Sequence, residues 1–394
     1  MKHCLVQGFR ERLICVRMVE TMNEQKEKKV EYVELVYDLI FVYMVGRNNS
    51  LLHHVDGGFV HAPSFLAYIL CTLAIIQVWN FTTFYVNMFG RNGVREHVFL
   101  FINMYLLYFV GESTRADYIN YMTQYHVAWG LILVNIGIQY LLELRNHEAD
   151  VWNRDIMKRM SATLFVEAAI VFLAAISVPA VSTALSAVAI VTGITLTAVS
   201  RNKSLGGSTD FMHLSERAML YVVFTFGEMI IALAGYFEGN GQWQWNTIYF
   251  SMMAFLIVVG LFLSYEVFYD HLINREGEYD GMLYLAIHIL ILFALNNITV
   301  SLEFMREAEV EVLPKMVFLV LSIVGYFVFL FALKGYVKQA CEKDWHFWLR
   351  LLLLTLAFIL CMLMFRNYMD LNIFLTVLYV FSIYSVLRRA KTKE

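Results

Sequence analysis

Long apolar runs alternate with short polar segments along almost the whole chain. A helix that crosses the hydrocarbon core of a bilayer needs about 20 mostly apolar residues. By that length the pattern predicts about twelve spanning helices, over residues 32–54, 64–88, 96–113, 122–143, 160–178, 180–200, 213–236, 245–269, 282–302, 313–334, 346–365 and 367–388.

The apolar run over residues 160–200 is too long for one span. As a single helix it would be about 60 Å long, about twice the thickness of the hydrocarbon core. Because proline interrupts the hydrogen-bond ladder of a helix, we expect a helical hairpin that turns at Ser177-Val-Pro179.

Positive charges are distributed unevenly over the connecting segments. If the N-terminus is cytoplasmic and successive spans alternate in direction, most Lys and Arg of these segments fall on the cytoplasmic side. This bias follows the positive-inside rule and holds to both ends of the chain. It predicts an even number of spans with both termini in the cytoplasm. The outer segments hold only Arg47, Arg115, Arg306, Lys315 and Arg366.

Composition indicates the same class of protein. The 394 residues are 59% hydrophobic and 16% charged, whereas soluble domains carry roughly a quarter charged residues. We therefore expect an all-α polytopic membrane protein that lies in the lipid bilayer. The net charge of -3 does not suggest a nucleic-acid partner, and the five scattered cysteines predict neither a disulfide framework nor a zinc site.

Two stretches six spans apart resemble each other. Residues 79–87 and residues 263–271 both carry a Phe-Tyr pair near the cytoplasmic end of a span. Since six is even, two such halves would share one orientation and form a parallel repeat. Aromatic residues at the membrane interface are the alternative explanation. The predicted division is a cytoplasmic extension (1–29), a first six-helix half (30–200), a linker (201–212) and a second half with a basic tail (213–394).

Two carboxylates stand at the front of the first span. Glu34 and Asp38 are four apart and share one helical face, where they would repel each other if both were ionised. The nearest cation at a similar depth is Arg217, in the seventh span. We therefore expect an Asp38–Arg217 or Glu34–Arg217 bridge. For Glu34 we favour a simpler role as a cap of the helix start; Asp38, one turn deeper, is the stronger candidate.

Other ionisable residues inside spans are costly, so they mark candidate sites. Glu228 lies deep in the seventh span and predicts a polar cavity, while Gly227 could serve close helix packing. Glu216 points about 100° away from Arg217 around the helix. His53 and His54 are expected at the outer interface, too far from the acids to share a site, and we expect no metal or cofactor. The remaining candidates for a substrate or proton pathway are Trp79, Asn80, Tyr85, His213 and His288.

Three spaced motifs resemble the bacterial low temperature requirement protein A (LtrA) family. They are residues 33–42 followed by His53-His54, Trp79 with Phe84-Tyr85, and residues 213–217 followed by Gly227-Glu228. The sequence departs from the family pattern at Tyr37 and Met229. The resemblance implies a multi-pass protein of the bacterial inner membrane, linked by name to growth in the cold. It implies no particular substrate.

These patterns favour a transporter or permease of an unidentified small solute or ion, with proton coupling as an option. Asp38 or Glu228 would bind and release the proton, and Arg217 would hold a counter-charge. The alternative is a membrane stress sensor or structural protein without transport activity. We expect no enzymatic activity, because GxSxG, HExxH and P-loop motifs are absent from the sequence. A homo-oligomer is compatible with the sequence.

Overall fold

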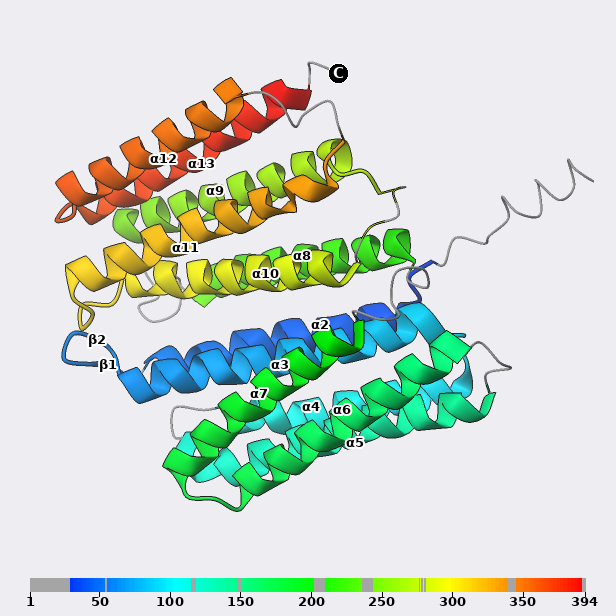
Figure 1. Ribbon diagram of the computed structural model, residues 1–394. Helices are drawn as coiled ribbons and strands as arrows, with labels where there is room; N and C mark the ends of the chain where they lie inside the picture. The colour runs from blue at the N-terminus through cyan, green and yellow to red at the C-terminus, as the bar shows by residue number, and fades with distance from the viewer. Residues whose placement is uncertain are drawn as a thin grey trace, which may run out of the picture.

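The computed structural model describes residues 29–53, 55–114, 118–146, 151–201, 210–235, 244–275, 277, 279, 281–338 and 345–391. Each predicted span coincides with an α-helix (Figure 1). The helices are α2 (Tyr32–Asn48), α3 (Ala62–Phe89), α4 (Val94–Ser113), α5 (Tyr118–Asn146), α6 (Val151–Ala175), α7 (Pro179–Arg201), α8 (Phe211–Ala234), α9 (Trp245–Val267), α10 (Gly281–Phe304), α11 (Val312–Ala332), α12 (Trp345–Met364) and α13 (Met369–Lys391).

The end of the first span differs from the expectation. The α-helix stops at Asn48, continues as a 3-10 turn η1 (Asn49–His53), and is followed by a short antiparallel hairpin of β1 (Val55–Asp56) and β2 (Phe59–Val60). At the end of this helix a polar side chain bonds to a neighbouring helix. The side-chain amide of Asn48 donates to the hydroxyl of Thr72 on α3 at 3.3 Å. The expectation that residues 32–54 form one helix was therefore wrong in its last turn.

The break between α6 and α7 is confirmed. Residues 176–177 form a turn, and Pro179 is the first residue of α7. Proline is well placed there because the first N–H groups of a helix have no partner within it.

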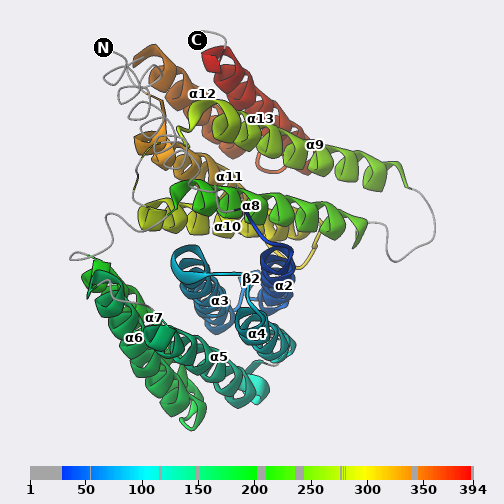
Figure 2. The ribbon, with the colours of Figure 1, turned by 90° about the vertical axis from the view of Figure 1, so that its right-hand side faces the viewer.

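The fold is an all-α polytopic membrane bundle. Nine helices of the described ranges are long and apolar enough to cross a membrane, namely α3, α5 and α7 to α13. The helix α2 is only 17 residues long, and α6 begins with a charged turn that contains Arg154 and Asp155. Both lie among the spanning helices, as does α4 (Figures 1 and 2).

The six helices α2–α7 and the six helices α8–α13 have the same order of neighbours. In the first group α2 packs on α3 and α4, the chain continues through α4–α5–α6–α7, and α7 returns to α3. In the second group α8 packs on α9 and α10, the chain continues through α10–α11–α12–α13, and α13 returns to α9. A parallel repeat would produce this recurrence; the boundaries of the two halves stay a prediction. The groups meet where α2 and α3 contact α8 and α10 (Figure 2).

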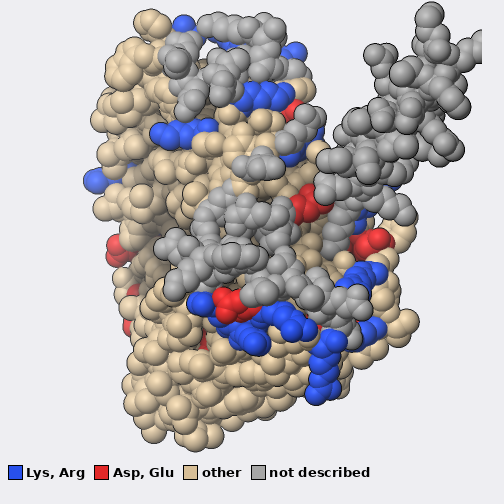
Figure 3. Space-filling model, turned by 45° about the vertical axis from the view of Figure 1, so that its right-hand side comes forward, with Lys and Arg blue, Asp and Glu red and all other residues tan. Residues whose placement is uncertain are grey.

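The helices α2 and α8 begin at the same end of the bundle, on the right in Figure 1, where both ends of the described chain also lie. Many of the Lys and Arg side chains visible in Figure 3 gather around this end, while the flanks of the bundle are mostly uncharged. We call it the basic end. It is the end that the charge pattern of the sequence predicts to be cytoplasmic.

Candidate functional site

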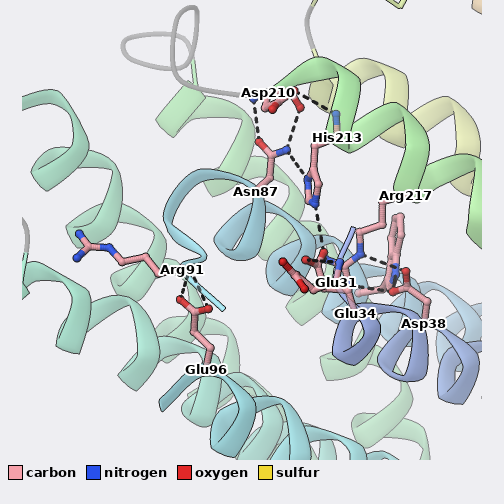
Figure 4. Close-up of polar contacts among 10 residues, drawn as sticks. Glu31, Glu34, Asp38, Asn87, Arg91, Glu96, Asp210, His213 and Arg217 are labelled. Carbon is pink, nitrogen blue, oxygen red and sulfur yellow. Dashed lines mark hydrogen bonds and ion pairs between the residues drawn. The ribbon is translucent and has the colours of Figure 1, made fainter. Parts of the chain in front are cut away.

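A cluster of charged side chains lies where α2 contacts α8, near the basic end (Figure 4). The helix α2 contributes Glu34 and Asp38, and α8 contributes His213 and Arg217; in each helix the two residues are four apart and so share a face. None of these four residues is more than 2% exposed. With Trp79 of α3 they form what we call the Arg217 cluster.

Arg217 pairs with both carboxylates. Its Nη2 and Nε donate to the two oxygens of Asp38 at 2.9 and 3.1 Å, and its Nη1 lies 3.2 Å from Glu34 Oε2. The bidentate contact to Asp38 is the geometry in which a guanidinium binds a carboxylate most strongly. The expected bridge between the first and seventh spans is therefore confirmed, and it includes both acids.

Glu34 combines the two roles that the sequence left open. Its Oε1 accepts a hydrogen bond of 3.5 Å from the backbone N–H of Glu31 at the start of α2. Its Oε2 faces Arg217 and lies 3.4 Å from His213 Nε2. The preference for a capping role alone was too narrow, because one oxygen caps the helix while the other takes part in the cluster.

Trp79 completes the bonding of Asp38. Its indole Nε1 donates to Asp38 Oδ1 at 2.7 Å, so this carboxylate accepts three hydrogen bonds. The guanidinium carbon of Arg217 lies 5.9 Å from the centre of the Trp79 ring, within cation–π range. Tyr221, one turn after Arg217, packs against Trp79 with ring centroids 4.8 Å apart.

His213 is oriented by Asn87 of α3. The side-chain amide of Asn87 is fixed by the backbone of Asp210, since it donates to the Asp210 carbonyl at 2.9 Å and accepts from its N–H at 3.1 Å. The same Nδ2 then donates to His213 Nδ1 at 3.1 Å. The ring proton of a neutral His213 consequently lies on Nε2, toward Glu34. With a neutral histidine, two carboxylates face one guanidinium, and the cluster carries one net negative charge.

Two residues of this network were not among the candidates. Asp210 also caps α8, because its Oδ1 accepts from the backbone N–H of His213 at 3.1 Å. An aspartate directly before an apolar helix is a sequence signal for such a cap. Asn87 carries only the signal of a polar residue inside an apolar span, because its role depends on how α3 packs against the start of α8.

Glu228 lies in a different place, toward the far end of α8. It lines a cavity of about 200 Å³ at the opposite end of the interface from the Arg217 cluster. The structure therefore places Glu228 at a cavity, and its role in a pathway stays a prediction. A Cβ on Gly46 would approach Glu228 Oε1 to 2.6 Å, whereas a Cβ on Gly227 would meet open space. The close contact involves Gly46 and not Gly227. The lining residues are Gly46, Arg47, Asn49, Ser50, Glu228, Ala232, Thr299 and Glu303.

Tyr85 does not join the Arg217 cluster. Its hydroxyl donates to Glu143 of α5 at 3.3 Å, and Glu143 also binds Arg95, so Tyr85 belongs to a separate network inside the first half. His288 lies within the second half, 3.1 Å from the hydroxyl of Tyr265.

The other candidates lie outside the cluster or outside the described residues. Glu216 is partly buried on α8, and it is not a member of the ion pairs that form the Arg217 cluster. Asn80 is partly buried on α3. The side chain of His53 and the whole of His54 lie outside the described residues. In the described part of the chain, no three His, Cys, Asp or Glu residues form a group that could hold a metal ion.

A family model matches most of the chain. The model described as bacterial low temperature requirement A protein (LtrA) matches residues 29–383. This range includes every residue of the Arg217 cluster and of the cavity around Glu228. No curated protein and no solved structure matches the chain.

Proposed function

The chain belongs to the bacterial low temperature requirement A (LtrA) family, and we propose that it is a proton-coupled transporter or permease of a small solute. We place it in the inner membrane with both termini in the cytoplasm, on the basis of the positive charges at the basic end. The proposal includes a role in growth under cold or stress and no enzymatic activity.

The observation that carries this proposal is the position of the Arg217 cluster. Charged groups buried in a membrane protein are costly, and well-packed apolar residues would often hold two helices together equally well. Here the charges lie between α2 and α8, where the two groups of helices meet. Such a contact suits a protein whose halves must separate, because water and solute can replace each ionic partner.

The two ends of the interface differ. At the basic end the Arg217 cluster closes the contact between α2 and α8, with Asp38 fully buried. At the opposite end the cavity around Glu228 lies between the same helices and α10. Gly46 and Asp38 are eight residues apart, which is about 12 Å along α2. In the proposed cycle the solute enters at Glu228 and leaves after the Arg217 cluster opens.

The cavity can recognise a polar or cationic solute. Glu228 and Glu303 provide carboxylates, and Asn49, Ser50 and Thr299 provide neutral oxygen atoms. Next to it, Asn296 donates to Asn49 at 2.8 Å and to Tyr68 at 2.7 Å, which continues the polar lining into the bundle. Because Asp38 is held by Arg217 and Trp79, we assign the exchange of protons in this pathway to Glu228.

The second candidate function is a membrane stress sensor or a structural protein. The complete bonding of Asp38 favours it, because three hydrogen bonds and an ion pair also suit a permanent fastening between α2 and α8. In that case the Arg217 cluster fixes the packing of the helices and the halves do not separate.

Reconstituted protein separates the two functions. Purified protein is placed in liposomes that contain a pH-sensitive dye, and a panel of alkali cations, amines, amino acids and carboxylic acids is added outside. We expect at least one compound to drive proton movement through the wild type. Glu228→Gln should abolish this movement without loss of folding.

Glu216→Gln is the matched control on the same helix, because Glu216 lies outside both the Arg217 cluster and the cavity. It should retain the proton movement of the wild type. If no compound moves protons, or if Glu228→Gln behaves like the wild type, the transport proposal is wrong and the structural function is favoured.

A further inference from the structure

A carboxyl group lies buried inside the first half, away from the Arg217 cluster. Glu167 of α6 is 0% exposed, and its Oε2 accepts a hydrogen bond of 3.3 Å from the side chain of Gln77 on α3. Gln77 also donates to the carbonyl of Ile190 on α7 at 3.4 Å. Three helices therefore surround this carboxyl group, the group α3, α6 and α7 in Figure 2.

The helix α7 passes unusually close to this pair. A Cβ on Gly193 would collide with both Gln77 Nε2 and Glu167 Oε2. Any larger residue at this point would force these two buried side chains to shift. The arrangement thus depends on a matched set of residue types: an acid, an amide and a glycine on three different helices.

In the described part of the chain Glu167 differs from Asp38, Glu34 and Glu143 in its lack of a cation. Asp38 and Glu34 share Arg217, and Glu143 binds Arg95. Among the described residues, Glu167 has only the amide of Gln77 as a bonding partner. An ionised carboxylate without a cation is very costly in such an environment, and a buried acid of this kind takes up a proton instead.

The titratable groups on the helices around Glu167 lie at other positions along the helix axes than Glu167 itself. The helix α7 has none before Arg201 at its end. Those on α3 are Tyr68, Cys71 and Tyr85, and those on α5 are Tyr118, Tyr121, Tyr125, His126, Tyr140, Glu143 and Arg145. The hydrogen bond that Glu167 accepts comes from Gln77 and not from any of these groups.

Polar groups continue from Glu167 toward both ends of the first half. In one direction Glu143 accepts from Tyr85, which follows Gln77 by eight residues or about 12 Å along α3. In the other direction His126 lies 2.6 Å from the hydroxyl of Ser186, which precedes Gly193 by seven residues or about 10 Å along α7.

Within the described ranges, several buried polar atoms of α3, α5, α6 and α7 have no hydrogen-bond partner. They include one side-chain oxygen each of Glu167 and Gln77, both polar atoms of the Gln139 side chain, and the Ser182 hydroxyl. Buried polar atoms are normally bonded to protein or to ordered water. The unpartnered oxygen of Glu167 therefore marks a place where a proton or a water molecule can bind.

We propose that Glu167 is an exchangeable proton-binding site in the interior of the first half, separate from the interface between the halves. Uptake forms an O–H bond on the carboxylate with a proton from water, and release breaks that bond and returns the proton to water. The row toward Glu143 and the row toward His126 are the routes to the two membrane surfaces. The site does not depend on the solute pathway proposed above.

Infrared spectroscopy of the full-length protein in liposomes tests this site, with the proton itself as the ligand. At neutral pH the wild type should show the carbonyl band of a protonated carboxylic acid, and this band should shift in D₂O. The part of the band that comes from Glu167 should be lost in Glu167→Gln, which has nearly the same shape, and the full intensity should be retained in the control Glu34→Gln.

The possible outcomes are distinct. A band that is absent from the wild type, or that has the same intensity in Glu167→Gln as in the wild type, means that Glu167 is ionised and overturns the proposal. A band that is lost in Glu167→Gln but does not shift in D₂O means a permanently neutral structural acid and also overturns it. Neither measurement requires movement of a solute, so failure here is separate from failure of the transport proposal.

If Glu167→Gln does not fold, chemical modification of the wild-type protein alone tests the proposal. Dicyclohexylcarbodiimide reacts with protonated carboxyl groups in apolar surroundings, and mass spectrometry locates the modified residue. We expect modification of Glu167 and not of Glu34 or Asp38, which both pair with Arg217. An unmodified Glu167 would contradict the proposal.

Discussion

Arg217 balances the charge of two acids that are four apart on one helix. With Arg217 in place, Asp38 accepts three hydrogen bonds and Glu34 has a cation at 3.2 Å. Without it, two carboxylates would share a buried site in which His213 is the nearest remaining partner of Glu34. We therefore expect removal of the arginine side chain to lower the free energy of unfolding more than removal of any apolar neighbour.

Arg217→Gln should reduce the free energy of unfolding by about 3–5 kcal/mol, because it leaves buried carboxylates without their cation. Arg217→Lys should reduce it less, since the charge stays while the bidentate contact is lost. Unfolding in mixed micelles with increasing SDS measures both. The double variant Asp38→Asn/Arg217→Gln should be less destabilised than the sum of its single variants. Additive effects would contradict a direct pairing.

Trp79→Phe removes one hydrogen bond from Asp38 and keeps most of the aromatic packing. The expected loss in the free energy of unfolding is about 1.5–3 kcal/mol, as for hydrogen bonds to charged groups. Tyr85→Phe on the same helix is the control, because Tyr85 bonds to Glu143 instead. Tyr85→Phe should leave the coupling energy between Asp38 and Arg217 unchanged. If Trp79→Phe and Tyr85→Phe change this coupling energy equally, the assigned contacts are wrong.

At the scale of helices, the contacts depend on which side of each element faces a neighbour. Trp79 and Tyr85 are six residues apart on α3, so they point about 120° apart around the helix. Trp79 faces α2 and α8, and Tyr85 faces α5. Glycine allows close approaches at several points, among them one between α2 and α8 at Gly46 and one between α7 and the Gln77–Glu167 pair at Gly193.

Gly193→Ala should destabilise the protein by about 1–3 kcal/mol, the usual cost of an overfilled core. The added methyl group would collide with both side chains of the Gln77–Glu167 pair. Gly227→Ala should be neutral or stabilising by up to about 1 kcal/mol, because its Cβ meets open space and alanine favours the helix. Thermal unfolding of the two variants gives the comparison. Equal stability would contradict the close approach of α7.

The sequence predicted the helices well because length and apolarity alone determine a span. The bridge from Asp38 to Arg217 could also be predicted, since the positive-inside rule placed both residues at one depth. The roles of Asn87 and Tyr85 could not, because periodicity does not reveal which of several neighbouring helices a face of α3 contacts. The early end of α2 was missed because Asn48 bonds to Thr72 of another helix.

For the whole molecule, the order of neighbours in α2–α7 recurs in α8–α13, and the Arg217 cluster lies between the two groups. The cavity around Glu228 lies at the other end of the same interface. The interface between the two groups is closed at the basic end and contains the cavity around Glu228 at the opposite end. A transporter in one of its two states is expected to have such an interface.

Cysteine labelling tests the orientation of the bundle. In a variant without native cysteines, Asn92→Cys should react with a membrane-impermeant maleimide only after the cells are opened, because it lies between α3 and α4 at the basic end. Gly57→Cys, in the turn of the β1–β2 hairpin, should react in intact cells. The reverse pattern would place the termini outside the cytoplasm.

The most direct test of the account is the distance between the two halves at the basic end. Spin labels at Tyr32→Cys on α2, which is 86% exposed, and at the exposed Asp270→Cys after α9 report it by pulsed electron resonance. We predict a main distance population and a longer one in the wild type, with a larger share of the longer one in Arg217→Gln. A single distance that is identical in both proteins would show that the halves do not separate and would contradict the account.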